Sequence, residues 1–431
     1  MSGPGGRSRV AEGVRPTALV ARTVRLDVDP AEVDLVHFAG ANGVLWEHEG
    51  ISLAGRGVAT RLSAAVVDDG LAAVEVEEDE VDSPGTGPIA LGALPFTPDG
   101  RASLVVPERV LGRAPDGGFW LTTIGTFETA ASRATATSDD WPHRLRPRRG
   151  PAAIPVRSPS GFRLTAVPGH AEWCGSVAEA VATIDAGDVE KVVLARAVEV
   201  EADGLLVVPD ILRRLRALFP SCMVFSVDGF VGASPELLVA RVGLDVRSQP
   251  LAGTVARSGD PATDARLAAA LMASSKDRRE HGLVVDAVAA ALRPLCDRLD
   301  IPAAPAIVPL RNVAHLGTTI RGRLGAPAPS ALALARRLHP TPAVAGTPTL
   351  AALALLARLE GCTRGRYAGP VGWVDAHGNG EWAVGIRSAE VRGNRARLMS
   401  GNGIVAGSDP DDELAETQLK LQALLAAIVR P

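Results

Sequence analysis

Two runs near the C-terminus decide the fold class: Tyr367-Ala-Gly-Pro-Val-Gly-Trp-Val-Asp375 and Glu381-Trp-Ala-Val-Gly-Ile-Arg-Ser-Ala-Glu-Val391. Both runs have the β-branched and aromatic content of strands, and Gly378-Asn-Gly380 lies in the connection between them. Adjacent glycine and asparagine are typical of a tight hairpin turn, so the two strands are expected to pair antiparallel. Hairpins of this kind indicate an α+β fold rather than a doubly wound parallel sheet.

The rest of the sequence predicts further strands and helices and divides the chain into four parts. Strands are also expected at 191–200, 222–232, 236–241 and 396–400, and helices at 208–218, 264–299, 329–338, 347–359 and 410–428. Periodicity is lost in a Pro- and Arg-rich stretch, which predicts a linker or long loop. The expected parts are a disordered tail (1–20), a strand-rich part (21–134), the linker or long loop (135–161) and a C-terminal region (162–431).

Composition excludes several classes of partner. The chain has 431 residues, a net charge of −4 and only 3% aromatic residues, so neither a basic field nor stacking platforms favour nucleic acid. The longest apolar run, 349–356, is too short to cross a bilayer, and the N-terminus lacks an apolar signal segment. Four cysteines without metal-ligand or disulfide spacing suit a reducing compartment. We therefore expect a cytoplasmic protein that binds no membrane.

Lys191 is the first candidate for chemistry. The chain has only three lysines, Lys191, Lys276 and Lys420, among many arginines. A desolvated ammonium can lose its proton whereas a guanidinium cannot, so a retained lysine is a candidate base. Lys191 begins a predicted strand whose same face carries Val193, Ala195 and Ala197, and these small side chains leave room for a ligand. The alternative is a lysine at a strand end that reaches solvent, and this alternative also applies to Lys276.

Glu236 is the second candidate. In Phe230-Val-Gly-Ala-Ser-Pro-Glu-Leu-Leu238, Pro235 interrupts a strand and implies an edge or bulge, which would turn the next side chain in a new direction. The alternative is a solvent-facing glutamate after a Ser-Pro turn.

Two glutamates on separate predicted helices indicate a cation site. Glu280 has helical spacing with Leu283, Val284 and Ala287, and a carboxylate on an apolar stripe is costly unless it is paired or binds a cation. Glu416 lies on the final helix and has a similar apolar stripe, although it also forms an i,i+4 pair with Lys420 that needs no function to explain it. Two inward carboxylates with several waters would suit Mg²⁺.

The segment Gly401-Asn-Gly403-Ile-Val-Ala matches a dinucleotide-binding fingerprint only superficially. Too little chain follows it for a Rossmann unit. Backbone N–H groups facing a ligand carboxylate are a better interpretation of these glycines.

Together these segments resemble the chorismate-utilising enzymes over roughly residues 165–428. The motifs occur in the family's order: Lys-Val-Val-Leu-Ala-Arg at 191, Gly-Ala-Ser-Pro-Glu at 232, Pro-Leu-Ala-Gly-Thr at 250, Ser-Lys-Asp-Arg-Arg-Glu-His at 275, His-Pro-Thr-Pro-Ala at 339, Gly-Pro-Val-Gly-Trp at 369, Gly-Asn-Gly-Glu-Trp at 378, Ile-Arg-Ser-Ala at 386 and Glu-Thr-Gln-Leu-Lys at 416. Within that family the chain is most similar to the isochorismate synthases. The resemblance implies an α/β sandwich of large antiparallel sheets with a deep central cleft, and it makes 162–431 the chorismate-binding catalytic region.

The resemblance also implies the roles of individual residues. Lys191 would activate a water that attacks C2 of chorismate, and Glu236 would protonate the departing C4 hydroxyl. Glu280 and Glu416 would hold Mg²⁺. Substrate contacts are expected from Gly253, Thr254, His315, Ala343, Val344, Tyr367, Arg387, Gly401, Gly403 and Lys420. Asn402 departs from the family pattern, in which alanine is usual.

Several related activities are alternatives. Lys191 argues against anthranilate synthase, and Ala252 argues against aminodeoxychorismate synthase, which carries a lysine there. Ala343 replaces the threonine of the ammonia-using relatives, so water is the expected nucleophile and no glutaminase subunit is expected. Salicylate synthase remains an alternative, as does a catalytically silent chorismate-binding protein. The product is expected to supply menaquinone synthesis, with a siderophore as the alternative, and the protein is expected to be a monomer.

Overall fold

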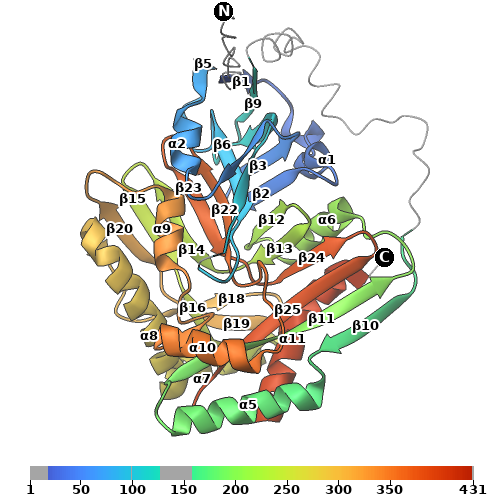
Figure 1. The fold of residues 1–431 in the computed structure, drawn as a ribbon, viewed down its shortest axis with the longest axis vertical. Helices are drawn as coiled ribbons and strands as arrows, with labels where there is room; N and C mark the ends of the chain where they lie inside the picture. The colour runs from blue at the N-terminus through green and yellow to red at the C-terminus, as the bar shows by residue number, and fades with distance from the viewer. Residues whose placement is uncertain (1–17, 99, 127–157, 430–431) are drawn as a thin grey trace, which may run out of the picture.

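The structure is a computed structural model that describes residues 18–98, 100–126 and 158–429. Two large sheets dominate it, and helices cover their outer faces (Figure 1). The predicted tail 1–20 and linker 135–161 lie almost entirely outside the described residues. The α+β class is confirmed, because every described strand pairing except that of β1 (Leu19–Leu26) with β5 (Glu75–Asp79) is antiparallel.

The larger sheet has thirteen strands. Its order is β10 (Phe162–Val167), β11 (Lys191–Ala202), β25 (Arg395–Ile404), β24 (Ser388–Arg392), β13 (Phe230–Ser234), β12 (Met223–Val227), β2 (Val44–His48), β3 (Ile51–Arg56), β8 (Arg109–Arg113), β9 (Phe119–Thr126), β1 and β5, with β21 (Gly346–Thr347) beside β11. The long pair β11 and β25 forms the part of this sheet that carries Lys191 and the two glycines of the 401–403 motif.

The second large sheet has nine strands, and a small third sheet lies beside the cleft. The nine-stranded order is β17 (Cys296–Asp300), β20 (Ile320–Leu324), β15 (Asp245–Gln249), β14 (Leu237–Val242), β23 (Gly380–Val384), β22 (Pro370–Asp375), β6 (Ile89–Ala93), β7 (Ser103–Val106) and β4 (Thr60–Ser63). The third sheet is β16 (Leu251–Ala256), β19 (Val313–Gly317) and β18 (Ala306–Pro309). The predicted hairpin is confirmed as β22 and β23, which pair antiparallel in this sheet.

Helices pack on both sides of the sandwich. They are α1 (Leu35–Ala39), α2 (Val67–Ala72), α5 (His170–Asp185), α6 (Val208–Leu218), α7 (Pro261–Ala273), α8 (Ser275–Leu292), α9 (Ala331–Leu338), α10 (Thr349–Leu359) and α11 (Pro410–Val429). Short 3₁₀ turns occur at Pro30–Glu32 and Arg293–Leu295. Helices α6 and α11 cover the larger sheet, whereas α9 covers β14, β22 and β23. No helix among the described residues is both long and apolar enough to span a membrane.

Two predicted elements were wrong in extent. The single helix expected at 264–299 is two helices and a strand, because Ser274 has an extended backbone and its hydroxyl caps α8 by accepting the N–H of Asp277 at 3.2 Å. The strand expected at 222–232 is the hairpin β12–β13. Asp228 and Gly229 turn the chain there with φ values of 48° and 77°, as a tight two-residue turn requires.

The third error shows how the cleft is built. The strand expected at 381–391 is β23 followed by β24, and these strands belong to different sheets. Arg387, with φ of 51°, lies in the crossing between them. A second crossing runs alongside, because β13 ends in the larger sheet at Ser234 and β14 begins in the other sheet at Leu237. Glu236 lies in that crossing, so Pro235 marks a change of sheet rather than a bulge.

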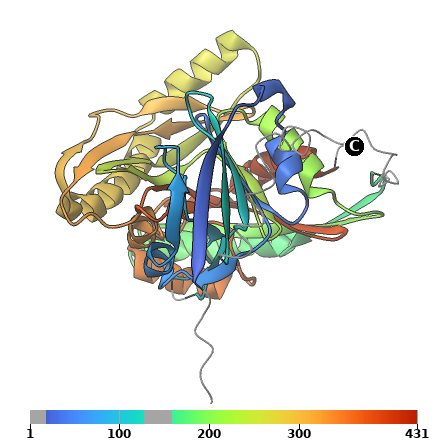
Figure 2. The same ribbon diagram turned by 90° about the horizontal axis from the view of Figure 1, so that it is seen from above.

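The N-terminal part contributes strands to both large sheets. β2 pairs with β12 and β6 pairs with β22, so segments distant in sequence share the same hydrogen-bonded ladders. Seen from above, the N-terminal strands stand side by side in front of the C-terminal elements (Figure 2). Buried side chains such as Trp46, Trp120, Phe225 and Trp373 fill the space between the sheets. The strand-rich part thus packs directly on the strands that lead to the two crossings.

Candidate active site

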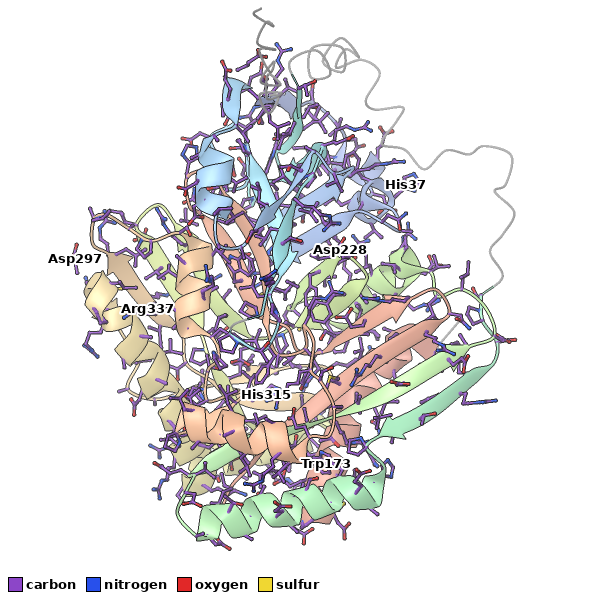
Figure 3. All side chains as sticks on the ribbon, in the orientation of Figure 1. His37, Trp173, Asp228, Asp297, His315 and Arg337 are labelled. Atoms are coloured by element: carbon purple, nitrogen blue, oxygen red, sulfur yellow. The ribbon has the colours of Figure 1, made fainter. Side chains whose placement is uncertain are left out.

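One cavity collects every residue that the sequence singled out for chemistry. Strands β11 and β25, the two crossings, strands β16 and β19, and helices α8 and α11 all contribute to its wall. The predicted residues on that wall are Lys191, Glu236, Gly253, Thr254, Glu280, His315, Ala343, Val344, Tyr367, Arg387, Gly401, Gly403, Glu416 and Lys420. His315, one of these wall residues, is labelled in Figure 3, among the C-terminal elements.

Lys191 does not reach solvent, as the alternative interpretation required. It is the first residue of β11, its side chain is 1% exposed, and its Nζ lies 2.7 Å from Glu280 Oε1 on α8. Gly403 on the neighbouring strand makes this contact possible. A Cβ at position 403 would lie 2.8 Å from both Glu280 Oε1 and the Cε of Lys191. The glycine is therefore needed because the lysine and the glutamate meet directly over it.

Glu236 is buried and holds a proton near neutrality. Burial raises its pKa from 4.5 to about 7, and this effect outweighs a backbone hydrogen bond from Leu251 and the positive charges of Lys191 and Arg387. Its backbone is fixed at the crossing: its N–H donates to Ser234 Oγ at 3.2 Å, and its carbonyl accepts the N–H of Val384 at 3.0 Å. The side chain can therefore act as a positioned acid.

The C-terminal helix supplies a lysine–glutamate pair on another part of the wall. Lys420 Nζ lies 2.7 Å from Glu416 Oε1 and donates to Asn402 Oδ1 at 2.6 Å. Burial alone would raise the pKa of Glu416. The charges of Lys420 and Arg387 and a hydrogen bond from Thr254 lower it by more than burial raises it, so the net shift is downward. Asn402 is buried, and its Nδ2 donates to Glu413 Oε2 at 3.0 Å. The residue that departs from the family pattern thus bridges Lys420 and Glu413.

His315 is neutral and has a defined orientation. Burial, together with the charges of Arg387 and Lys420, lowers its pKa to about 3. Its Nδ1 lies 3.1 Å from the Gly253 carbonyl, which can only accept, so this nitrogen carries the hydrogen. Its Nε2 faces Arg387 Nη2 at 3.5 Å. A histidine held in this form has no imidazolium proton to supply near pH 7, whereas Glu236, with its raised pKa, is a candidate acid.

The donor set of the cavity fits a hard cation such as Mg²⁺. Glu280, Glu413 and Glu416 all line it, and carboxylate oxygens supplemented by waters are the ligands that Mg²⁺ prefers. Among the described residues, no three or more His, Cys, Asp or Glu side chains are gathered closely enough to form a metal site by themselves. Glu280 and Glu416 instead each contact a lysine ammonium, so their negative charges are balanced by cations in this structure.

Several residues on the wall were missed or given no function from the sequence. Glu413 was given no function, because acidic residues are ordinary in the first turn of a helix. Its i,i+3 spacing to Glu416 nevertheless puts both carboxylates on one face of α11, and both line the cavity. Burial raises its pKa despite hydrogen bonds from Ser408 and Asn402. Lys276 also lines the cavity rather than only facing solvent. Arg364 was not noticed, because its surroundings in sequence carry no pattern.

Known proteins similar to this chain share its length and architecture. The family model described as chorismate binding enzyme matches residues 52–429. The similarity therefore begins well before residue 165, where the sequence motifs had placed its start. A Mycobacterium tuberculosis protein provisionally named isochorismate synthase MenF is 44% identical over 358 residues, which cover 80% of this chain and 87% of that protein. Isochorismate synthase DhbC of Bacillus subtilis is 37% identical over 352 residues, covering 79% and 81%.

A solved structure agrees with the fold. The menaquinone-specific isochorismate synthase MenF of Escherichia coli superposes with a TM-score of 0.81 at 27% identity, and the match covers 96% of this chain and 95% of that one.

Proposed function

The chain belongs to the chorismate binding enzyme family, and we propose that it is a magnesium-dependent isochorismate synthase that adds water to C2 of chorismate with loss of the C4 hydroxyl. The observation that carries this proposal is the pair of opposite catalytic groups in one cavity. Lys191 is buried beside a carboxylate, and Glu236 keeps its proton up to about pH 7. A base and an acid on one wall suit a displacement that removes a proton from one oxygen and gives one to another.

The proton and bond changes balance between these two side chains. Lys191 as the free amine takes a proton from water while the water oxygen bonds to C2. The two conjugated ring double bonds shift together, from C1=C2 to C1=C6 and from C5=C6 to C4=C5. The C4–O bond breaks, and Glu236 gives its proton to the departing hydroxyl. One water enters and one leaves, and afterwards Lys191 carries a proton that Glu236 lacks. Transfer of that proton through solvent after product release restores both groups.

Glu280 and Glu416 would hold the magnesium ion, with Glu413 available on the same face of α11. The bound cation would supply positive charge for the ring carboxylate of the substrate. Glu280 also holds Lys191 in position, because its Oε1 lies 2.7 Å from the lysine Nζ.

The remaining wall binds and orients chorismate. Arg387 and Tyr367 would contact a carboxylate of chorismate, and the hydroxyl of Tyr367 accepts a hydrogen bond from the backbone N–H of Gly401. His315 presents a neutral ring near Arg387 and would hold the leaving group by hydrogen bonding. Ala252 and Ala343 add no nucleophile or acid to the wall. Because the ammonia-using relatives carry threonine where this chain has Ala343, water is the expected nucleophile and no glutaminase subunit is expected.

Product analysis tests this proposal. Purified enzyme with chorismate and Mg²⁺ should give a growing isochorismate peak by chromatography, while a lactate dehydrogenase-coupled assay for pyruvate stays at background. Stoichiometric pyruvate with salicylate fluorescence would replace the proposal with salicylate synthase. Chorismate that binds without turnover would replace it with a silent binding protein.

We further propose that the isochorismate supplies menaquinone synthesis. The likeness to the two MenF proteins supports this, whereas the likeness to DhbC favours a siderophore. Expression of the gene in a bacterium that lacks its own menaquinone-specific isochorismate synthase should restore menaquinone. Restoration of a catecholate siderophore without menaquinone would favour the other pathway.

A further inference from the structure

A second cavity, of about 540 Å³, lies on the same face of the larger sheet as the active site. Alternate side chains of a strand share one face. Along β11, Lys191 and Val193 line the active site, whereas Glu199 and Glu201 line the second cavity. On β25, Gly401 and Gly403 line the active site, whereas Arg397 and Met399 line the second cavity. The segment after α10 crosses between them, because Arg364 and Tyr367 line both cavities.

The second cavity carries an excess of positive charge. Its arginines are Arg163, Arg364, Arg392, Arg395 and Arg397, and its acidic residues are Glu199, Glu201 and Glu390. Four of these groups already have an ion-pair partner. Arg395 pairs with Glu201 at 3.1 Å. Glu390 pairs with Arg366 and Arg364 pairs with Glu360, and neither of these two partners lines the cavity. In the described part of the chain, the lining groups left without an ion pair are Arg163, Arg392, Arg397 and Glu199. The cavity therefore has two more unpaired positive charges than negative ones.

Arg397 offers the most specific anchor for an anion. It is half-buried, and its Nε has no hydrogen-bond partner among the described residues, whereas its side chain hydrogen-bonds the thiol of Cys362. Glu199 and Glu390 lie opposite it on the neighbouring strands, yet neither forms an ion pair with it. The guanidinium carries five N–H donors, so it keeps hydrogen-bonding capacity for a bound anion. A carboxylate is a suitable anion, since a guanidinium binds it through two parallel N–H···O bonds.

The floor of the cavity is apolar. Phe230, Tyr367 and Met399 line it, and all three side chains are buried. Aromatic rings and a methionine thioether favour contact with a flat ring. The volume also falls in the range of small-molecule sites. We propose that this cavity binds a planar aromatic carboxylate, with the carboxylate on Arg392 and Arg397 and the ring against Phe230 and Met399.

A ligand there would act on the active site through the shared wall. Arg364 Nη1 donates to the Val344 carbonyl at 2.7 Å, and its Nη2 donates to the Val193 carbonyl at 2.5 Å. Val193 and Val344 both line the active site, and Tyr367 contacts Gly401. The ligand touches Arg364 and Tyr367 from the opposite side without entering the active site. Its occupancy therefore changes turnover without displacing chorismate.

Direct binding of 2-naphthoate, a fluorescent aromatic carboxylate, tests the site. Wild-type protein should quench or shift its fluorescence saturably, and Arg392→Met/Arg397→Met should raise the Kd at least tenfold. The matched control is Arg323→Met, an exposed arginine of β20 that pairs with Asp245 on the other sheet and should bind like wild type. The neutral analogue 2-naphthylmethanol should bind more weakly than 2-naphthoate, because it cannot use the arginines.

Initial rates test the coupling. With wild type, 2-naphthoate should change kcat for chorismate, and Arg392→Met/Arg397→Met should abolish that effect. Purely competitive inhibition that persists in the double variant would place the ligand in the active site and overturn the proposal. Absence of saturable binding, or equal binding of the neutral analogue, would also overturn it. The binding assay needs no turnover, so its outcome is independent of the proposed reaction.

Discussion

Replacement of Glu236 by glutamine should make the protein more stable at alkaline pH while it removes activity. The pKa of Glu236 is about 7 in the folded protein against 4.5 for an ordinary glutamate, chiefly because the side chain is buried. A group whose pKa is raised on folding stabilises the fold fully below the unfolded pKa. That contribution is lost as the pH rises through the folded pKa. The wild type should therefore lose stability between about pH 4.5 and 7, and the glutamine variant should not.

The size of the effect follows from the two pKa values. The difference between about 7 and 4.5, at about 1.4 kcal/mol for each pH unit, gives a loss of about 3 kcal/mol above neutrality. The side chain is 4% exposed, so solvent screening reduces this figure little. Relative to wild type, Glu236→Gln should gain most of this free energy of unfolding between pH 5 and pH 8.

Urea unfolding followed by tryptophan fluorescence at several pH values measures this difference. Glu172→Gln, an exposed glutamate on α5, is the matched control and should show no comparable pH dependence. In parallel, kcat/KM of wild type should fall above about pH 7 as Glu236 loses its proton. A stability difference between Glu236→Gln and wild type that stays constant from pH 5 to 8 would refute the assignment of Glu236 as a protonated acid.

Three further predictions concern the other polar groups of the cavity. Lys191→Arg should be as inactive as Lys191→Ala, with a loss of roughly 10²–10⁴-fold in kcat, because arginine keeps the charge but cannot accept a proton; appreciable turnover by the arginine variant would reduce Lys191 to an electrostatic role. Glu280→Gln and Glu416→Gln should each raise the Mg²⁺ concentration for half-maximal activity by roughly tenfold or more, and calorimetric Mg²⁺ titration should show the same weakening; full activity after exhaustive chelation would contradict the metal assignment. Asn402→Ala should lower the free energy of unfolding by about 1.5–3 kcal/mol, because Lys420 and Glu413 each lose a hydrogen bond, and it should raise the KM for chorismate; unchanged values of both quantities would show that the bridge is unimportant.

The site was more predictable from the sequence than the fold around it. Lys191, Glu236, Glu280, Glu416 and the glycines at 401 and 403 were marked by their chemistry in local motifs, for instance a lysine at a strand start or a glutamate on an apolar helical stripe. The other candidates, such as His315 and Arg387, came only from the resemblance to the family. All of these residues line one cavity, although their chemical roles stay predictions. Glu413 and Arg364 escaped notice because an acidic helix start and an isolated arginine are ordinary features. Their importance arises only from tertiary contacts, such as that of Asn402 with Glu413.

The errors in the fold have physical causes of two kinds. Some were local signals given too little weight, such as the Asp228-Gly229 turn and the helix cap at Ser274. Others have no local signal. The chain that continues from β23 to β24 looks like one strand, yet it changes sheet near Arg387 because its partners belong to two separate ladders. The pairing of β2 with β12 likewise depends on residues far apart in sequence.

The most direct test of the central claim, attack by an activated water at C2, is the fate of solvent oxygen. The reaction is run in oxygen-18 water to low conversion, so that the reverse reaction does not label the chorismate pool, and isochorismate is analysed by mass spectrometry. One oxygen-18 atom is expected in the product, located in the C2 hydroxyl. An unlabelled product would contradict it, because the C4 hydroxyl would then have migrated within the substrate and Lys191 would have no water to activate.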